Sequence, residues 1–276
     1  MIARVARVTR RAVLQAAGLA AGAYALTNVL QPVLSRAEPP ASAAAPTYFS
    51  GSFVSAARGG IETNWAIARP PGQSGPLRPV IALHGHGSNA TEVMNMGVPD
   101  GLARVVAAGL PPFAVVSVDG GDTFWHRRAS GADSGEMVLS ELLPMLPAHG
   151  LDTSRVAFMG WSMGGYGALL LGSRLGPART AAICAVSPAL WTSYLMTDNG
   201  AFDNYADWAN NTVFGRQELT SIPMRVDCGT GDRFYGAARA FVAQLGRPVS
   251  GSFSMGGHDV SYWRGQLPGE LAWMAT

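Results

Sequence analysis

One serine of the chain has the surroundings of a catalytic nucleophile. Ser162 is the centre of Gly160-Trp161-Ser162-Met163-Gly164, which follows the apolar run 156–159 and leads into a segment of helical character, 165–171. A G-x-S-x-G pattern between a strand and a helix predicts a sharp turn that exposes the serine Oγ. Such a turn needs glycine on both sides, because a Cβ there would collide with neighbouring backbone. We therefore expect Ser162 to be a nucleophile, with the free N–H groups of the following helix directed at the reacting centre.

A serine nucleophile needs a base, and the base needs an acid that orients it. After a turn of this type the acid precedes the histidine along the chain, and His258 is the one histidine beyond Ser162. It lies in a Gly-Gly-His-Asp turn after a strand-like run, which indicates an exposed loop. Asp232 ends a Gly-Thr-Gly-Asp sequence directly after another apolar run. The alternative acids are Asp227, which lies within that strand, and Asp259, which adjoins the base and is expected to point elsewhere. We predict Ser162, Asp232 and His258 as the triad.

An oxyanion hole requires two backbone N–H groups that face the developing negative charge. One is expected from Met163, directly after the nucleophile, and the other from the loop 84–88, His-Gly-His-Gly-Ser, with the N–H of His86 as donor. A metal pair formed by His84 and His86 is the alternative for this loop. No cysteine or convincing third ligand stands nearby, so we expect neither a metal nor a cofactor.

The elements that must position these residues predict an α/β protein. Residues 47–58 and 62–69 alternate in polarity and are expected to form two antiparallel strands joined at Gly59-Gly60. Continuous apolar runs then indicate buried parallel strands, at 80–83, 113–118, 156–159, 181–186 and 224–227, with a last strand near 251–255. Helical spacing marks 136–146 and 235–245. This alternation predicts a mainly parallel central sheet with helices on both faces.

The segment 190–221 interrupts that alternation. It is long and carries five large aromatic residues, Trp191, Tyr194, Phe202, Tyr205 and Trp208. Long segments without regular structure inside a domain are often functional. We expect a lid or wall over the site, and the alternative is a packed surface excursion that has no part in binding.

The composition excludes several chemistries. All 20 positions counted as lysine or arginine are arginine, so a Walker-A loop, a Schiff-base lysine and a Ser-Lys hydrolase are excluded. Histidine is then the credible base for Ser162. The net charge of +2 is too small to predict a nucleic-acid partner. Cys184 and Cys228 lie in successive strand-like runs and are expected to be buried free thiols, because neighbouring parallel strands rarely orient two Cβ atoms for a disulfide; a bridge is the alternative.

The N-terminal residues predict an export signal over 1–37. They contain five arginines and no acid, and residues 12–30 are uncharged and rich in Ala, Leu and Val. Thr9-Arg10-Arg11-Ala12-Val13-Leu14 resembles a twin-arginine signal. Cleavage is expected after Ser35-Arg36-Ala37 or Ala43-Ala44-Ala45, and the alternative is an uncleaved membrane anchor. Residues 38–46 then form a Pro/Ala linker, and residues 47–276 are expected to form one catalytic domain. Without residues 1–37 the chain has 15 arginines and 18 acids, a formal charge of −3.

Four motifs together resemble those of the putative esterase family. They are the His-Gly loop 84–88, Gly-Trp-Ser-Met-Gly-Gly-Tyr-Gly-Ala at 160–168, Gly-Thr-Gly-Asp at 229–232, and Gly-Gly-His-Asp at 256–259 followed by Tyr262-Trp263-Arg264 and Leu267-Pro268. The resemblance spans about residues 60–275. The family contains esterase D-type hydrolases, feruloyl and acetyl-xylan esterases, and the mycolyltransferases of mycolic-acid envelopes. The resemblance implies an α/β-hydrolase fold.

The resemblance also implies residues on the substrate side. Trp125-His126-Arg127-Arg128, with Asp133-Ser134-Gly135-Glu136, looks like the family's variable substrate-side segment. It implies substrate contacts from Trp125, His126 and Arg127, and from Trp161 beside the nucleophile; the alternative is a salt-bridged loop. The envelope mycolyltransferases commonly use Glu as the acid and a different oxyanion loop, so the His-Gly-His-Gly sequence favours a hydrolase.

These features predict an exported serine esterase that acts on carboxylic esters through an acyl-enzyme. Its substrate is expected to be a small-molecule, glycan or lipid ester, and its location the periplasm, the cell wall or the medium, with membrane or cell-wall association. Two alternatives stay open. One is an envelope acyltransferase that passes the same acyl group to a sugar or lipid alcohol. The other is a non-catalytic envelope-binding protein on a hydrolase scaffold.

Overall fold

The computed structural model describes residues 47–276. The predicted export signal 1–37, its cleavage sites and the linker 38–46 lie outside the described residues. None of the helices within 47–276 combines the length and the apolar character that a bilayer crossing requires.

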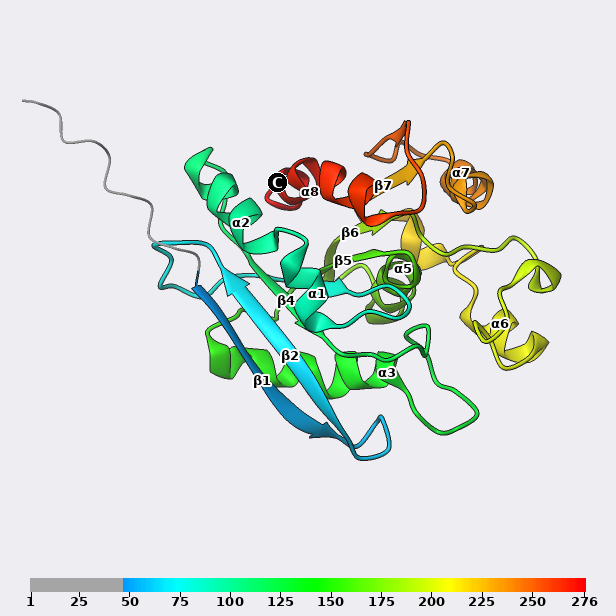
Figure 1. Ribbon diagram of the computed structural model, residues 1–276, viewed down its shortest axis with the longest axis horizontal. Coiled ribbons are helices and arrows are strands. Elements are labelled where there is room, and N and C mark those ends of the chain that lie inside the picture. Colours follow the sequence, from blue (N-terminus) through cyan, green and yellow to red (C-terminus); the bar gives the residue numbers. More distant parts are fainter. Residues whose placement is uncertain (1–46) are drawn as a thin grey trace, which may run out of the picture. The chain divides into compact units, whose positions relative to one another are not determined.

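A single sheet organises the described part of the chain (Figure 1). Its strand order is β1-β2-β4-β3-β5-β6-β7-β8. The strands are β1 (Thr47–Ser55), β2 (Ile61–Arg69), β3 (Pro79–Leu83), β4 (Ala114–Val118), β5 (Val156–Trp161), β6 (Thr180–Val186), β7 (Met224–Gly229) and β8 (Phe253–Ser254). β2 pairs antiparallel with β1 and with β4, and all other neighbours pair parallel. The predicted mainly parallel sheet is confirmed, and so is the antiparallel hairpin at its start.

Helices cover both faces of the sheet, as predicted. The principal ones are α1 (Ala90–Asn95), α2 (Val98–Ala107), α5 (Met163–Leu175), α7 (Tyr235–Gln244) and α8 (Val260–Met274). α1, α2 and α8 pack on one face, in a core that includes Val80 and Ala82 of β3. α5 and α7 pack on the other face, in a core that includes Ile81 and Leu83 of the same strand. Every residue of β3 is buried, which explains why this strand reads as a continuous apolar run rather than as an alternation.

The helix predicted over 136–146 is present as a continuous but irregular helical segment. It consists of α3 (Ser134–Glu136), a π-helical stretch η1 (Met137–Leu142), α4 (Leu143–Met145) and a 3₁₀ turn η2 (Leu146–His149). Pro144 lies at the start of α4. A proline inside a helix lacks an N–H donor and its ring clashes with the carbonyl one turn earlier, so the turn widens to the π form at this point.

The segment 190–221 contains only short helical elements, η3 (Tyr194–Met196), α6 (Tyr205–Asn211) and η4 (Gln217–Thr220). Its Trp191 and Phe202 are buried in the core shared with α5. Aromatic side chains therefore anchor the segment to the domain. The loop between Trp191 and Phe202 borders the site described below.

Candidate active site

Ser162 occupies a strained turn between β5 and α5. Its φ is 56° and its ψ is −117°, a region that non-glycine residues rarely adopt. The flanking glycines allow the turn because backbone passes very close to them. A Cβ on Gly164 would lie 1.9 Å from the carbonyl oxygen of Leu83, and a Cβ on Gly160 would lie 2.3 Å from that of Gly164. The predicted strand–turn–helix geometry is thus present, with Ser162 at its apex.

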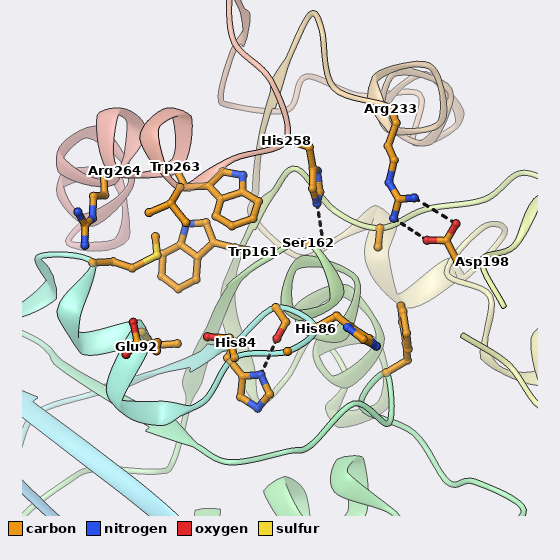
Figure 2. A pocket seen from close by; sticks show the side chains of 18 of the residues that line it. His84, His86, Glu92, Trp161, Ser162, Asp198, Arg233, His258, Trp263 and Arg264 are labelled. Carbon is orange, nitrogen blue, oxygen red and sulfur yellow. Dashed lines mark hydrogen bonds and ion pairs between the residues drawn. The ribbon is translucent and has the colours of Figure 1, made fainter. Parts of the chain in front are cut away.

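The three residues predicted as a triad form one hydrogen-bonded chain (Figure 2). The Oγ of Ser162 lies 2.8 Å from Nε2 of His258, and Nδ1 of His258 lies 2.8 Å from Oδ2 of Asp232. The three residues follow β5, β7 and β8 along the chain, so all of them lie where parallel strands end. The carboxylate accepts from Nδ1–H, which leaves the lone pair of Nε2 directed at the serine.

Asp232 is held as a carboxylate by its hydrogen bonds. Its side chain is completely buried, and burial by itself raises the pKa of a carboxyl group. Hydrogen bonds from His258 and from the backbone N–H of Phe234 outweigh that cost, so the pKa of Asp232 is below its usual value. Asp227, the alternative acid, is bonded instead to Arg225 and Ser252.

Two aromatic rings pack against His258. The rings of Phe234 and Trp263 each stand edge-on to the imidazole, with centroids 5.2 Å away. Asp259, the residue after the base, caps α8 by accepting from the N–H of Tyr262. His258 is therefore positioned both by the helix that follows it and by the rings beside it.

Backbone strain is concentrated around the site. The non-glycine residues with positive φ in the described part of the chain are Phe124, Trp125, Ser162 and Ser187. Ser187 directly follows β6, and its N–H donates to the carbonyl of Asp227 in β7, while the N–H of Ser162 donates to Val186. Strain of this kind costs about 1–3 kcal/mol per residue and persists where the surrounding structure enforces it. At these strand ends the backbone therefore holds residues in fixed positions at a cost in stability.

The loop 84–88 lies against the serine turn. A Cβ on Gly85 would be 3.6 Å from the Cβ of Ser162. His84 anchors the loop from below: its Nε2 accepts from the N–H of Gly120, and its Nδ1 faces the carbonyl of Gly85. Burial lowers the pKa of His84. Because both ring nitrogens already have partners, His84 is a structural anchor and not half of a metal pair. His86 extends from the loop, largely exposed, towards Asp122.

A pocket of about 710 Å³ opens over Ser162. It is lined by His84, Gly85, His86, Gly87, Ser88, Glu92, Val93, Met96, Phe124, Trp161, Ser162, Ala189, Asp198, Asn199, Arg233, His258, Val260, Trp263 and Arg264. One side carries Trp161 and Trp263, and the other carries an ion pair between Arg233 and Asp198 (Figure 2). The volume suits a small-molecule ligand.

Of the four residues predicted on the substrate side, only Trp161 lines this pocket. Trp125 is buried beneath His84, with their rings 5.0 Å apart. His126 is buried too, stacked on Phe202, and Arg127 is exposed away from the pocket. The prediction that Trp125, His126 and Arg127 contact substrate is wrong, because none of them lines the pocket.

The alternative for that stretch, a salt-bridged loop, describes it better. Arg128 pairs with Asp203 at 2.8 Å. The carboxylate of Asp203 also accepts from the N–H of Ala129. The stretch therefore fastens the 190–221 segment to the domain.

The sequence analysis did not predict three residues that line the pocket, Phe124, Asp198 and Arg233. The 190–221 segment contributes Asp198 and Asn199 to the pocket wall, which agrees with the predicted wall rather than with a remote excursion. One signal could have found Arg233, because it directly follows Asp232. Asp198 has no such signal, because its position depends on how an irregular segment folds.

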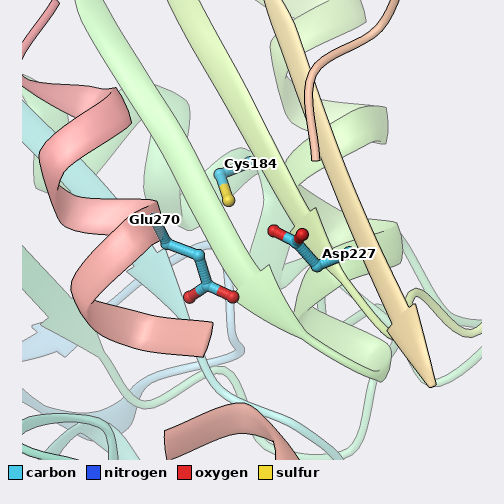
Figure 3. Close-up of side chains that lie close together, drawn as sticks. All are labelled: Cys184, Asp227 and Glu270. Atoms are coloured by element: carbon cyan, nitrogen blue, oxygen red, sulfur yellow. The ribbon is translucent and has the colours of Figure 1, made fainter. Parts of the chain in front are cut away.

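A second group of titratable side chains does not line the pocket; Figure 3 shows its three members close together. Cys184 of β6, Asp227 of β7 and Glu270 of α8 are all fully buried, with one donor atom of each within 4.8 Å of the others. Asp227 is paired with Arg225. Burial above all, and the charge of Asp227, raise the pKa of the Cys184 thiol, so the thiol is protonated. In this group the charge of Asp227 is therefore balanced by Arg225, and the neighbouring thiol is uncharged. Cys228 is also free and buried, as predicted.

A serine turn at the end of a parallel strand, coupled through histidine to a carboxylate, defines the serine hydrolases of the α/β-hydrolase fold. Comparison with protein families narrows this class. The putative esterase family matches residues 60–274, and the chain belongs to that family. Its enzyme class is accordingly that of the carboxylic ester hydrolases. No curated protein matches the chain.

Solved structures share the fold. A ferulic acid esterase superposes with a TM-score of 0.72 at 21% identity, over 83% of this chain and 98% of that one. A fluorophosphonate-binding serine hydrolase of Staphylococcus aureus gives 0.72 at 20% identity, over 84% and 99%. An S-formylglutathione hydrolase of Agrobacterium tumefaciens gives 0.66 at 20% identity, over 85% and 96%. At these identities the similarity establishes the α/β-hydrolase fold alone.

Proposed function

We propose that the chain is an exported serine esterase whose catalytic triad is Ser162, His258 and Asp232. The observation that carries this proposal is the unbroken series of hydrogen bonds from the serine Oγ through the imidazole to the buried carboxylate. A non-catalytic binding protein would gain nothing from a strained serine aimed at a base, and such strain is selected where it serves a mechanism.

The proposed reaction begins when His258 takes the proton of Ser162 as Oγ bonds to the ester carbonyl carbon. The carbonyl electron pair moves onto oxygen, which the N–H groups of Met163 and His86 stabilise. Met163 is the first residue of α5, so its N–H has no acceptor within the helix. Collapse of this intermediate expels the alcohol, which receives its proton from His258. Water then repeats both steps on the acyl-enzyme, which releases the acid and restores Ser162.

The pocket walls favour an ester that carries an apolar or aromatic group. Trp161, Trp263 and Phe124 present ring surfaces within the pocket, and aromatic side chains bury large flat groups effectively. The structurally similar ferulic acid esterase is named for an aromatic acid. Together these observations support a small-molecule ester with a planar or aliphatic substituent.

A fluorophosphonate probe tests the proposal. We expect the purified protein to be labelled at Ser162 and to hydrolyse p-nitrophenyl acetate, and Ser162→Ala to lose both. Ser140→Ala, an exposed serine on the helical segment 134–149, is the matched control and should be labelled like the parent. Labelling of Ser162→Ala to the same extent would refute the assignment. Adding a sugar acceptor identifies acyl transfer, because a transferase would yield the sugar ester in place of the free acid.

We also propose export, supported by the arginine cluster and the uncharged stretch 12–30. Mass determination of the protein recovered from culture fractions tests it. An exported protein that begins after residue 37 or 45 supports a cleaved signal. Full-length protein in the cytoplasmic fraction would contradict export. Arg10→Gln/Arg11→Gln should abolish export if the signal is of the twin-arginine type.

A further inference from the structure

A second, smaller groove adjoins the active-site pocket. It has a volume of about 400 Å³ and is lined by Leu190, Trp191, Thr192, Met196, Asp198, Arg233, Phe234, Gly236 and Ala237. Asp198 and Arg233 line the main pocket as well. The two cavities therefore share a wall, and these two side chains form it.

This wall is an ion pair that bridges two separate segments of the chain. Nη1 and Nη2 of Arg233 reach the two carboxylate oxygens of Asp198, at 3.3 and 2.5 Å. Arg233 belongs to the loop after β7, beside the triad aspartate, and Asp198 belongs to the 190–221 segment. Figure 2 shows the pair on the side of the pocket opposite the two tryptophans.

Opening the Arg233–Asp198 ion pair costs little free energy. Its side chains are 60% and 38% exposed, and an exposed pair of this kind favours the closed arrangement by at most about fivefold. Arg233 keeps a second contact when the pair opens, because its guanidinium lies 4.4 Å above the ring of Phe234. Opening the wall therefore requires only that the Asp198 side chain turn away.

The groove beyond the wall is suited to an apolar ligand. Apart from the ion pair and the hydroxyl of Thr192, it is lined by aliphatic and aromatic side chains and by glycine. Met196, which lines the groove, is strongly exposed, as is the preceding residue Leu195. A chain of methylene groups would cover the apolar side chains of this groove, and the exposed Asp198 and Arg233 would then be solvated by water.

We propose that this groove is an extension of the substrate site that binds an extended aliphatic chain of the ester, and that a long chain displaces the Asp198–Arg233 pair to enter it. The inference rests on the proposed esterase function. Short esters remain within the main pocket and do not reach the groove. The chain belongs either to the acid or to the alcohol of the substrate, and two series of esters distinguish these sources.

The first test fills the groove. Ala237→Trp on α7 places an indole in it, and Ala243→Trp places one at an exposed position of the same helix outside the groove. The readout is the ratio of kcat/KM for a long-chain to a short-chain ester. One series compares p-nitrophenyl decanoate with the acetate, and the other compares decyl acetate with ethyl acetate. We expect Ala237→Trp to lower the ratio at least about tenfold in one series, and Ala243→Trp to leave it within about twofold.

The second test opens the wall. Asp198→Ala should raise the same ratio by up to about fivefold, because the long chain no longer displaces an ion pair. Raising the ionic strength should raise the ratio in the parent protein and not in Asp198→Ala, because salt screens an exposed pair. If Ala237→Trp fails to fold, Thr192→Trp fills the groove from its exposed side.

The outcomes separate this inference from the function on which it rests. Equal ratios in Ala237→Trp, Ala243→Trp and the parent, with acetate hydrolysis intact, would overturn the extended site and leave the esterase standing. Absence of ester hydrolysis together with absence of fluorophosphonate labelling would overturn the proposed function itself.

Discussion

Two buried carboxyl groups of this protein, Asp232 and Glu270, have opposite protonation behaviour. The side chain of Asp232 is fully buried yet accepts hydrogen bonds from His258 and from the N–H of Phe234. Glu270 is also fully buried, and among the described residues neither of its carboxylate oxygens has a hydrogen-bond partner. Burial and the charge of Asp227 raise the pKa of Glu270 well above its usual value, whereas the pKa of Asp232 is lowered.

The difference indicates that hydrogen-bond donors, and not the depth of burial, decide whether a buried carboxyl group is charged. A charge without donors in a dry interior is so costly that the group takes up a proton instead. The donors around Asp232 therefore favour an anion that can orient a base, while burial favours the protonated form of Glu270, which lies between α8 and the sheet (Figure 3). An unsatisfied buried polar group costs about 1–3 kcal/mol, which identifies Glu270 as a source of instability.

The largest expected effect on activity comes from removing the negative charge of Asp232. Asp232→Asn should lower kcat on p-nitrophenyl esters by about 10⁴, because the amide no longer holds His258 in the tautomer that accepts the serine proton. Steady-state kinetics and a thermal melt measure this effect and check that the fold is kept. A loss below about tenfold would show that the base needs no orienting acid.

Asp227→Asn is the variant to compare with Asp232→Asn, because Asp227 lies in β7 and Asp232 lies in the turn that follows β7. Asp227 accepts from Arg225 at 2.6 Å and from the N–H of Ser252. Loss of its charge leaves Arg225 partly buried without a counterion, which should cost on the order of 3 kcal/mol. We expect denaturant unfolding to show this loss while kcat stays near that of the parent. A fall in kcat comparable to that of Asp232→Asn would mean that the wrong acid was chosen.

The positions of the three triad residues could be predicted from the sequence because each lies in a short motif with a local cause. Ser162 needs glycine on both sides, and Asp232 and His258 each follow a strand within a glycine-containing turn. The remaining pocket residues could not be predicted in this way. Asp198 reaches the site through an irregular segment, and His126 turned out to be buried by packing against Phe202, which no local pattern encodes.

The secondary structure, too, contains elements that could be predicted from the sequence and elements that could not. Buried strands such as β3 could be located because both faces are covered and the apolar run is continuous. α8 was not predicted, since Gly265, Pro268 and Gly269 interrupt its sequence and its buried positions include a glutamate, Glu270. Its stability derives from tertiary packing on the sheet and not from local propensity.

A smaller effect is expected when Glu270 is replaced by an apolar residue of similar size. Glu270→Leu removes an unpaired carboxyl group and keeps the contacts of its methylene groups, so the free energy of unfolding should rise by about 1–3 kcal/mol. Chemical denaturation at neutral pH measures this change, and kcat should remain that of the parent. Glu136→Leu, at an exposed helical position, controls for the general effect of added hydrophobicity. A destabilised Glu270→Leu would mean that the carboxyl group has a favourable partner, and the contrast with Asp232 would fail.

The most specific of the expected effects is in the pH dependence of stability. The folded pKa of Glu270 lies above its unfolded value, so between the two values the folded state binds the extra proton and stability falls as pH rises. Asp232 has the opposite sign, because its folded pKa is lowered: it contributes stability above the unfolded value, and this contribution is lost as pH falls through the folded pKa.

Glu270→Gln isolates the contribution of Glu270 to the pH dependence of stability from that of Asp232. The amide matches the protonated acid in shape and cannot ionise, so the variant should equal the parent in acid and become progressively more stable than the parent as pH rises above the ordinary range of a glutamate. Glu136→Gln, whose carboxyl group is exposed, should follow the parent throughout. Unfolding free energies measured by urea titration from pH 5 to pH 9 test this, because every unit of difference between the folded and unfolded pKa contributes about 1.4 kcal/mol. Parallel curves for Glu270→Gln and the parent would show that Glu270 ionises in the folded state as readily as in the unfolded chain, and that depth without donors does not keep this carboxyl group neutral.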